Sequence, residues 1–406
     1  MNRTRILFAA LALAALSSPS RAEDDPLSFR IERMQILTGP DEYYLFQSRG
    51  ALIPGAPPRV LVTTQETDRA GSHGYRDLFQ TFSDDGGKTW SPLARIDSLR
   101  RVTTGAGYDF VIGDVCPQWH AKTQVVLATG KTFGFREGTK EDKLLERVSY
   151  SVYSPKSGTW SGLQLVELPR SDHEGRPIAA ANAGCNQRFD LPDGEILLPI
   201  RYQKDPARNR YTTIVARCRF DGATLTYLEH GSELTRDKGR GLYEPSVAGF
   251  GGRFFLTMRA DDTGFVARSE DGLNYGAPLE WKFDDGAALG SYNTQQHWVA
   301  HSDALFLVYT RRGVDNDHVY RHRAPLLIAQ VDPQRLCVLR ETEQVLIPEN
   351  DATLGNFGVI EFSPGETWVI TSEGLAQGKR SAERNHVLIA KLHWSRPNRS
   401  FPASDK

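Results

Sequence analysis

One eight-residue stretch limits the possible folds of this chain more than any other. Residues 83–90 read SDDGGKTW, which combines a carboxylate, two glycines and a closing tryptophan. Asp85 can accept hydrogen bonds from backbone amides of its own loop, and Gly86 and Gly87 can take the positive φ angles of a tight turn. Trp90 can then cover the hairpin with apolar area. The stretch therefore predicts the tip of a β-hairpin, in which Asp85 has a structural role and not a catalytic one.

Weaker copies of this strand-and-turn unit recur along the chain. Each copy is an alternating strand that runs into a polar turn, and the copies begin roughly 50 to 70 residues apart. The six units are DLFQTFSDDGGKTW, RVSYSVYSPKSGTW, TIVARCRFDGATL, GFVARSEDGLNY, PLLIAQVDPQRL and HVLIAKLHWSRP. Six units of four strands, closed into a ring, predict an all-β fold, a six-bladed β-propeller. The segment from Glu23 to about Ile36 is expected to help close the ring.

The composition agrees with many short strands and turns. The chain has 406 residues, of which 39% are hydrophobic, and it contains 36 glycines and 22 prolines. These values argue against a long helical protein. The formal charge of −1 gives no bulk attraction to nucleic acid or to a membrane surface. We therefore expect neither nucleic acid nor a membrane as a partner.

The first residues are predicted to be an export signal. Arg3 and Arg5 precede an apolar run over 6–16, and small residues near position 22 suit a signal peptidase. Residues 1–22 are thus a predicted signal peptide, and residues 23–400 a single propeller domain. No later stretch approaches the ~18 apolar residues of a membrane span. We expect a periplasmic or extracellular protein.

The sequence gives no sign of a metal or another cofactor. An oxidising compartment permits disulfides, and Cys116 and Cys185 stand near the start of successive repeats, so they either pair between blades or remain buried free thiols. The spacing of the four cysteines matches no metal module; they are Cys116, Cys185, Cys218 and Cys337. His318 and His322, in DNDHVYRHR, are predicted to belong to a polar loop over the pocket and not to a metal cluster.

The positions of polar residues along the repeats predict one functional face. In a propeller the innermost strand of every blade runs beside the central axis, so the starts of these strands and the ends of the second strands meet at one mouth of the ring. The expected inner-strand starts are near Arg49, His120, Asn186, Glu244, His297 and Asn356. The expected second-strand ends are near 65–68, 130–131, Arg201, Arg259, Arg311 and Glu373. Some of these side chains can have only a packing role against neighbouring strands. We expect the others to bind a ligand at that mouth.

At this point the chain resembles the sialidase (neuraminidase) superfamily, whose propellers carry the hairpin-tip motif known as the Asp box. SRGALIP at 48–54 resembles the Phe/Tyr-Arg-Ile-Pro stretch of that family, with Arg49 in the arginine position. YEPSVAGFGGRFFLTMR at 243–259 resembles its Glu-Pro segment. The resemblance covers nearly the whole chain after the export signal.

The resemblance implies a cluster of arginines that holds the carboxylate of the substrate. Arg49, Arg259 and Arg311 stand on the blades that supply the three family arginines, with Arg312 as the alternative on the fifth blade. Guanidinium groups bind a carboxylate bidentately, and several together can overcome its solvation. Arg201 is a further arginine at the expected mouth.

Two catalytic carboxylates are also implied by the resemblance. The general acid of the family comes from the loop before the first Asp box, where ETDRAGSHGYRD offers Asp68, with Asp77 as a weaker candidate. Asp68 could equally be a solvated loop acid. Glu244 matches the glutamate that polarises the nucleophile. Glu244 could also form a buried salt bridge with Arg259, which would not exclude the catalytic role.

The chain departs from the family at the nucleophile. Sialidases of this kind use a tyrosine at the inner-strand start of the last blade, whereas LGNFGVIEFSPGETWVITSE places Asn356 and Phe357 there. Phenylalanine has no hydroxyl to ionise. Glu373 still follows at the expected distance, which supports the register. A covalent tyrosyl intermediate would therefore require a tyrosine from another blade, namely Tyr243, Tyr292 or Tyr309.

Two histidines are candidates for contact with a sugar. His120 follows Trp119, and His297 precedes Trp298. An indole face can cover sugar C–H groups while an imidazole holds a hydroxyl. The alternative is that each histidine has only a structural role.

Three functions remain open from the sequence. The preferred one is a glycoside hydrolase for an acidic glycan that contains sialic or uronic acid, with Asp68 as proton donor and Glu244 or His120 as base. In that function seven residues would bind the substrate: Arg49, Arg201, Arg259, Arg311, His297, Asn356 and Glu373. The second is a polysaccharide lyase that uses His120, His297 or Tyr309. The third is a non-catalytic glycan-binding propeller.

Overall fold

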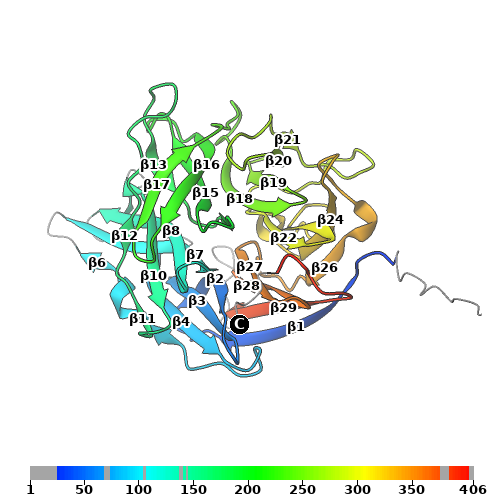
Figure 1. Cartoon of the computed structure of the whole chain (residues 1–406), viewed down its shortest axis with the longest axis horizontal. Coiled ribbons are helices and arrows are strands. Elements are labelled where there is room, and N and C mark those ends of the chain that lie inside the picture. The colour runs from blue at the N-terminus through cyan, green and yellow to red at the C-terminus, as the bar shows by residue number, and fades with distance from the viewer. Residues whose placement is uncertain are drawn as a thin grey trace, which may run out of the picture.

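The computed structural model describes residues 25–67, 74–103, 107–136, 140–142, 145–374 and 384–401. Six β-sheets surround a central axis, as Figure 1 shows. The described helical elements are short 3₁₀ turns such as Tyr320–His322. The predicted all-β, six-bladed propeller is confirmed. The predicted export signal and Asp68 lie outside the described residues.

Each blade is an antiparallel sheet whose strands follow one another outward from the axis. Blade 1 has β2 (Tyr44–Ile53), β3 (Arg59–Thr67), β4 (Tyr75–Ser83) and β5 (Ala94–Arg95). Blade 2 has β7 (Tyr108–His120), β8 (Val125–Arg136), β10 (Val148–Ser154) and β11 (Thr159–Trp160). Three short strands extend blade 2: β6 (Val102–Thr103), β9 (Lys140–Glu141) and β12 (Gln164–Leu165). Blade 3 has β13 (Ala179–Asn182), β15 (Ile196–Gln203), β16 (Tyr211–Phe220) and β17 (Leu225–His230), with β14 (Phe189–Asp190) beside β15.

The remaining blades repeat this order. Blade 4 has β18 (Tyr243–Phe250), β19 (Arg253–Arg259), β20 (Gly264–Ser269) and β21 (Leu279–Glu280), and blade 5 has β22 (His297–His301), β23 (Ala304–Tyr309), β24 (Leu326–Asp332) and β25 (Cys337–Val338), with β26 (Gln344–Ile347) beside β24. Blade 6 has β27 (Phe357–Ser363), β28 (Glu366–Ser372), β29 (His386–Trp394) and β1 (Phe29–Thr38). The six repeats found in the sequence contain the third strand of each blade.

The two ends of the chain close the ring together. β1 pairs antiparallel with β29, from Phe29 opposite Trp394 to Thr38 opposite His386, and the two strands lie side by side in Figure 1. The outermost strand of the last blade therefore comes from the N-terminal segment. The expected closing role of this segment is confirmed, with the strand itself beginning at Phe29.

The turn at 83–90 has the hydrogen bonds that its sequence predicts. Asp85 Oδ1 accepts from the backbone amides of Lys88 and Thr89, both at 3.0 Å. Gly86 and Gly87 have φ angles of 74° and 83°, a region that favours glycine. These hydrogen bonds lower the pKa of Asp85 to about 2, with the Thr89 hydroxyl as the largest cause. Asp85 is therefore a structural residue.

Asp271 holds the corresponding turn of blade 4. Its Oδ1 accepts from the amides of Leu273 at 2.9 Å and Asn274 at 2.7 Å. The side-chain amide of Asn274 donates to Oδ2 at 2.7 Å. Burial alone would raise the pKa of Asp271, but these hydrogen bonds outweigh it and hold the pKa well below its usual range.

Asp271→Ala is expected to lower the free energy of unfolding by about 1 kcal/mol at neutral pH, the usual loss when a capping side chain is replaced by alanine. Because the folded-state pKa is depressed, the contribution of the carboxylate is present above the unfolded pKa and is lost as the pH falls through the folded pKa. Urea unfolding of both proteins between about pH 7 and pH 2 measures the difference. A difference that is independent of pH would contradict this role.

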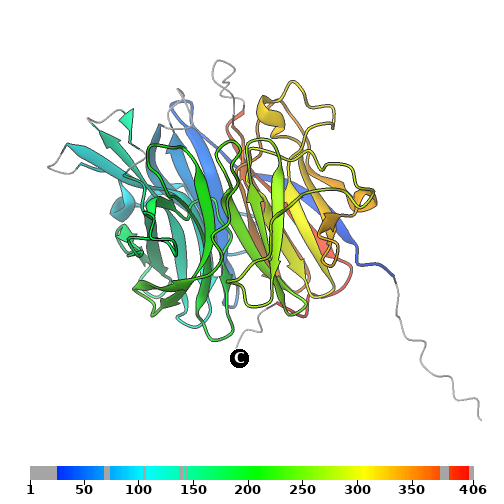
Figure 2. The same cartoon turned by 90° about the horizontal axis from the view of Figure 1, so that it is seen from above.

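Apolar clusters between neighbouring blades make the ring rigid. One cluster joins blades 4 and 5 and includes Trp281 and Trp298, both fully buried, with ring centroids 5.8 Å apart. Another joins blades 1 and 2 through residues such as Leu61 and Val126. Figure 2 shows the blades standing beside one another in this way. Packing of sheets face to face fixes the positions of the strand ends at the mouth.

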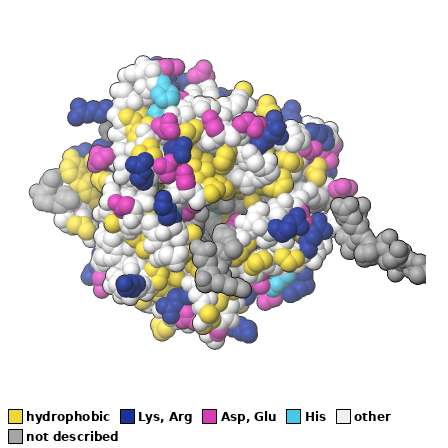
Figure 3. Space-filling model, viewed as in Figure 1, with side chains coloured by type: hydrophobic (Ala, Val, Ile, Leu, Met, Phe, Trp, Pro, Cys, Tyr) yellow, Lys and Arg dark blue, Asp and Glu magenta, His cyan; other side chains and the backbone are white. Residues whose placement is uncertain are grey.

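The face of the molecule seen in Figure 3 shows no dominant charge. On the face seen in Figure 3, acidic and basic side chains are interspersed, in agreement with the formal charge of −1. Within the described ranges, no helix has the length and apolar character needed to cross a membrane.

Candidate functional site

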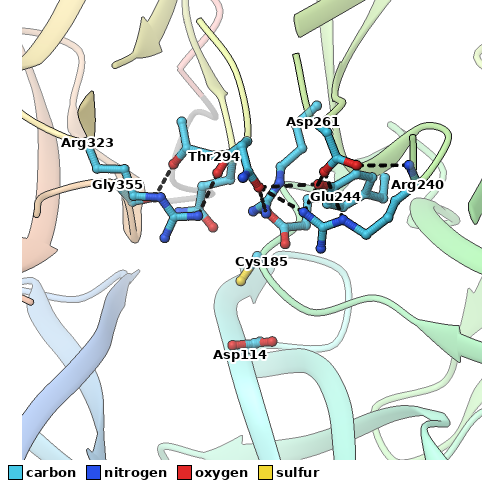
Figure 4. A network of polar contacts seen from close by, with 12 residues as sticks. Asp114, Cys185, Arg240, Glu244, Asp261, Thr294, Arg323 and Gly355 are labelled. Carbon is cyan, nitrogen blue, oxygen red and sulfur yellow. Dashed lines mark hydrogen bonds and ion pairs between the residues drawn. The ribbon is translucent and has the colours of Figure 1, made fainter. Parts of the chain in front are cut away.

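Irregularities in the inner strands bring polar side chains to the mouth. The register of the inner strands shifts near the mouth in β2, β7 and β18. The residues at these shifts have positive φ angles: Gln47 57°, Asp114 54° and Glu244 47°. Such bulges re-aim side chains and are common beside active sites. Figure 4 shows Asp114 and Glu244 in the same polar region, with Cys185 between them.

Asn293 joins three arginines at the centre of this region. Its Oδ1 accepts from Arg259 at 2.7 Å and from Arg240 at 2.9 Å. Its backbone oxygen accepts from Arg323 at 2.6 Å. Arg259 also forms a short ion pair with Glu244. The predicted salt bridge between Glu244 and Arg259 is confirmed, and the network is drawn in Figure 4.

A second group of charges comes from blades 2 and 3. Glu146 accepts from Lys131 Nζ at 2.8 Å and from an Arg201 nitrogen at 2.9 Å. Asp114 lies 4.0 Å from the ammonium group of Lys131. We call these residues, together with Arg49, Glu244, Arg259 and Arg323, the mouth cluster. It contains five cationic side chains and three carboxylates: Arg49, Lys131, Arg201, Arg259 and Arg323 against Asp114, Glu146 and Glu244.

The pKa values of two carboxyl groups of the mouth cluster shift in opposite directions. Burial would raise the pKa of Glu244, but the positive charges of Arg259 and Arg323 outweigh it and hold the pKa below its usual range. Burial raises the pKa of Asp114 despite the charge of Lys131, and Asp114 Oδ1 has no hydrogen-bond partner among the described residues. Carboxyl groups whose environments push their pKa values apart suit a base and an acid.

The arginines of the mouth cluster keep unused hydrogen-bond donors. One buried nitrogen of each of Arg201, Arg259 and Arg323 has no partner among the described residues. Burial and the neighbouring charge of Arg259 lower the pKa of Arg323 to about 10. Buried donors without partners are costly. The arrangement therefore favours an anionic ligand that accepts hydrogen bonds.

Within the mouth cluster, Arg49 has its guanidinium donors in use. It donates to the backbone oxygens of Phe357 at 3.1 Å and Val115 at 3.4 Å, and to Gln295 Oε1 at 2.9 Å. Arg49 and His297 line an internal cavity of about 40 Å³, which has room for water and not for a sugar. The main contribution of Arg49 to the mouth is therefore its positive charge, and not direct contacts with a ligand.

Arg311, a predicted member of the clamp, is bound to Glu343 and not to a residue of the mouth cluster. Its guanidinium group is bound to Glu343, at 2.6 Å and 2.8 Å, and Tyr309 donates to the same carboxylate. The side chain therefore braces blade 5. Arg323, which the sequence analysis missed, supplies the fifth-blade arginine instead. Arg312 lies over the ring of Tyr292, 4.1 Å from its centroid.

Arg311→Ala is expected to lower the free energy of unfolding by roughly 1–3 kcal/mol, because it leaves the half-buried carboxylate of Glu343 without its cation. Ligand binding at the mouth should not change. Urea unfolding and a binding titration of the same variant separate the two effects. Loss of ligand binding in a variant that stays folded would show that Arg311 is part of the clamp.

The two predicted histidines have different positions. His120 ends β7 instead of starting it, and its ring contacts the Gly194 oxygen at 2.9 Å and Thr123 Oγ1 at 2.7 Å. The prediction that His120 lies at an inner-strand start is wrong, because β7 begins twelve residues earlier, at Tyr108. His297 does start β22. Burial, together with the charge of Arg49, lowers the pKa of His297 to about 3, so His297 is neutral.

The predicted residues of blade 6 are held within the fold. Phe357 is fully buried and its ring packs edge-on against His297, with centroids 4.9 Å apart. Asn356 is partly buried and directly precedes β27. Glu373 accepts from the His386 backbone amide at 3.1 Å and from its ring at 2.7 Å. These contacts hold Glu373 against His386, the first residue of β29.

The remaining acid and nucleophile candidates can be sorted by their contacts. Asp68 lies outside the described residues, and Asp77 accepts from the Arg101 amide at 3.1 Å, which is a structural contact. Tyr243 donates its hydroxyl to Asp261 at 2.7 Å. Tyr309 is buried against Glu343. Tyr292 is partly exposed and contacts His322 at 2.6 Å.

Among the residues that the structure describes, two groups of side chains could hold a metal ion. The first lies on the outer side of blade 3 and lines a groove of about 400 Å³; its members are His173, His230 and Glu233. The two imidazole rings are stacked 4.2 Å apart and parallel within 4°, so their lone pairs do not converge. The second group is His318, Glu349 and Asp351, in which the two carboxylates come from the segment after β26. All four cysteines are free thiols.

Three of the eight residues of the mouth cluster were not predicted from the sequence: Asp114, Glu146 and Arg323. Asp114 and Glu146 belong to blade 2, where the inner strand was expected to start at His120. The signal that could have located Asp114 is the polar residue inside an otherwise apolar strand, VIGDVCPQW. Arg323 was missed because it comes from a loop between strands and not from a strand end.

Comparisons with solved structures find the same fold at low sequence identity. A protein of unknown function from Dyadobacter fermentans superposes with a TM-score of 0.64 and 14% identity over 89% of this chain and 99% of its own. Trypanosoma rangeli sialidase gives a TM-score of 0.62 and 12% identity over 89% of this chain. The Hadza microbial sialidase Hz136 gives 0.58 and 12% over 87% of this chain and 66% of its own.

The shared region covers only part of the trypanosomal enzyme. The chain spans 59% of the length of Trypanosoma rangeli sialidase. The sequence matches no protein-family model and no curated protein. The structural likeness therefore establishes a sialidase-like propeller fold and leaves the activity to be argued from the site.

Proposed function

We propose that this protein is an exported, sialidase-like glycoside hydrolase that acts on a glycan containing an acidic sugar, either sialic or uronic acid. The observation that carries the proposal is the set of unused, buried guanidinium nitrogens on Arg201, Arg259 and Arg323. A carboxylate is the natural partner of several converging guanidinium groups. The Trypanosoma rangeli sialidase, which shares the fold, has been solved in complex with sialic acid.

The proposed roles follow from the protonation of the carboxyl groups. The three arginines bind the sugar carboxylate, while Glu244 is held ionised by them and stabilises positive charge that develops at the anomeric carbon. Asp114 is the proton donor to the leaving oxygen, because burial favours its protonated form. Asp68, predicted from the sequence, is retained as a second candidate for the proton donor.

A non-catalytic glycan-binding function is the second candidate. The observation in its favour is Phe357, which is buried where the sialidase resemblance places a tyrosine nucleophile. A propeller with the arginines but without a nucleophile would bind and not cleave. The lyase function is not favoured, because His120 and Tyr309 are both engaged in structural contacts away from the cluster.

The experiment is a product assay of the purified protein on sialylated glycans and on uronate-containing polysaccharides. Free sialic acid, new reducing ends and the absorbance of unsaturated uronate are followed together. The proposal expects a saturated product that is lost in Glu244→Gln. An unsaturated product would assign a lyase, and binding without any product would assign a glycan-binding protein.

A further inference from the structure

Three side chains beside the mouth cluster form a continuous hydrogen-bonded chain. The hydroxyl of Tyr292 lies 2.6 Å from His322 Nδ1, and His322 Nε2 lies 3.1 Å from Asp317 Oδ1. With Nε2 protonated and bonded to the carboxylate, Nδ1 is free to accept the phenol proton. A hydroxyl next to a base that is itself oriented by a third group is the arrangement of an activated nucleophile.

The chain is attached directly to the arginine network. Tyr292 precedes Asn293, and His322 precedes Arg323; these neighbours are joined by the 2.6 Å hydrogen bond from Arg323 to the Asn293 oxygen. Asn293 also accepts from Arg259. A sugar whose carboxylate contacts Arg259 and Arg323 therefore lies next to the segment that carries the Tyr292 hydroxyl.

The surroundings of Tyr292 stabilise negative charge. The guanidinium group of Arg312 lies over the phenol ring, 4.1 Å from its centroid. A cation over an aromatic face is attracted to it, and the attraction grows when the ring oxygen carries negative charge. Arg312 thus places a positive charge against the Tyr292 ring.

The backbone at this site is held in an unfavourable conformation. Asn293, Arg321 and His322 have φ angles of 48°, 56° and 52°. Residues other than glycine rarely adopt such angles, and they collect at functional sites when surrounding contacts enforce them. Here the strained residues are the ones that place the His322 ring against Tyr292.

The other candidate tyrosines lack an imidazole partner, although the guanidinium groups of Arg240 and Arg259 also lie over the ring of Tyr243. Tyr243 and Tyr309 are buried, and each donates its hydroxyl to a carboxylate, Asp261 and Glu343 respectively. Burial, together with the adjacent negative charge, raises the pKa of both phenols. Tyr292 is partly exposed and has an imidazole as its partner.

We propose that Tyr292 is the nucleophile of the proposed hydrolase, with His322 as its base and Asp317 as the residue that orients His322. This inference rests on the proposed function. The Tyr292 oxygen bonds to the anomeric carbon as its proton passes to His322 Nδ1, and the glycosidic C–O bond breaks as its oxygen takes the proton of Asp114. Water then attacks the same carbon, giving one proton to Asp114, and the Tyr292 oxygen leaves and recovers its proton from His322. The sum is hydrolysis of one glycosidic bond.

The test combines covalent trapping with substitutions. A fluorinated sialyl or uronyl fluoride, which slows the second step, is incubated with the wild-type protein, and proteolytic peptides are mapped by mass spectrometry. The added sugar mass is expected on Tyr292. Tyr292→Phe should lower kcat about 100- to 10,000-fold, whereas the matched control Tyr309→Phe should retain wild-type activity. The double variant with His322→Gln should be no slower than Tyr292→Phe alone, because the two residues act as a unit.

The outcomes separate this inference from the proposed function. Labelling of a different residue, or a Tyr292→Phe rate within about threefold of the Tyr309→Phe rate, would overturn the role of Tyr292 while leaving the hydrolase intact. A wild-type protein that neither reacts with the probe nor releases sugar would overturn both proposals together.

Discussion

Asp114→Asn is expected to lower kcat for natural glycan substrates about 100- to 10,000-fold, the usual contribution of a general acid. Asparagine keeps the shape of the side chain and tolerates the positive φ angle of 54° at this bulge, so the change removes the proton without disturbing the strand. Burial raises the pKa of Asp114 in the folded protein, and its ionisation at neutral pH therefore opposes folding. The variant should be at least as stable as the wild type.

A substrate with a better leaving group provides the control for this prediction. A 4-nitrophenyl glycoside of the same acidic sugar needs little or no protonation of its leaving oxygen. The loss of activity in Asp114→Asn should therefore be much smaller on this substrate than on the natural glycan. Equal losses on both substrates would show that Asp114 is not the proton donor and would turn attention to Asp68.

Arg323→Met is expected to weaken binding of an acidic sugar about 30- to 1,000-fold, since it removes one buried partner of a charge-assisted contact worth about 2–4 kcal/mol. The same change should not destabilise the fold. Burial and the charge of Arg259 lower the pKa of Arg323 to about 10, which means that the folded state disfavours the charged form. Methionine removes this cost, at the loss of the hydrogen bond to the Asn293 oxygen.

Calorimetric titration with the sugar acid and urea unfolding of the same preparation measure both effects. Weak binding with unchanged or raised stability is the signature of a residue kept for ligand binding. Arg311→Ala is the matched control, with lower stability and unchanged binding. A large loss of stability in Arg323→Met would instead assign Arg323 a structural role.

The fold was predictable because its signals are local. A carboxylate such as Asp85 or Asp271 accepts hydrogen bonds from the amides of its own turn. The residues that form the turn are therefore consecutive in the sequence. Repetition of that unit at regular spacing then determines the number of blades. The closing strand was also predictable, because a ring must join its ends, although no pattern marks the residue at which it begins.

The site was only partly predictable because it depends on details that are not local. Glu244 and Arg259 were found, since they lie at the start and the end of paired strands. His120 was misplaced because β7 continues across a bulge at Asp114 and projects beyond the mouth. Arg311 and Arg323 both follow strand β23, and only the path of the loop between them decides which one reaches the arginine network. Such a choice leaves no pattern in the sequence.

The mouth cluster lowers the stability of the fold, and this supports a role for the cluster in function. Five cationic side chains share the mouth with three carboxylates, and three of the arginines leave a buried donor unused. Like charges in close contact, and unpaired donors, lower stability. Proteins retain such arrangements where they serve a ligand.

The most direct test of the central claim is a calorimetric comparison of a sugar acid with its neutral methyl ester. The probes are free sialic acid and free glucuronic acid, each alongside its ester, titrated into the wild-type protein. The account predicts that at least one acid binds and that its ester binds at least about 30-fold more weakly, because the ester cannot carry the charge that the arginines recognise. Equal affinity of acid and ester, or no binding of either acid, would contradict a carboxylate site at the mouth.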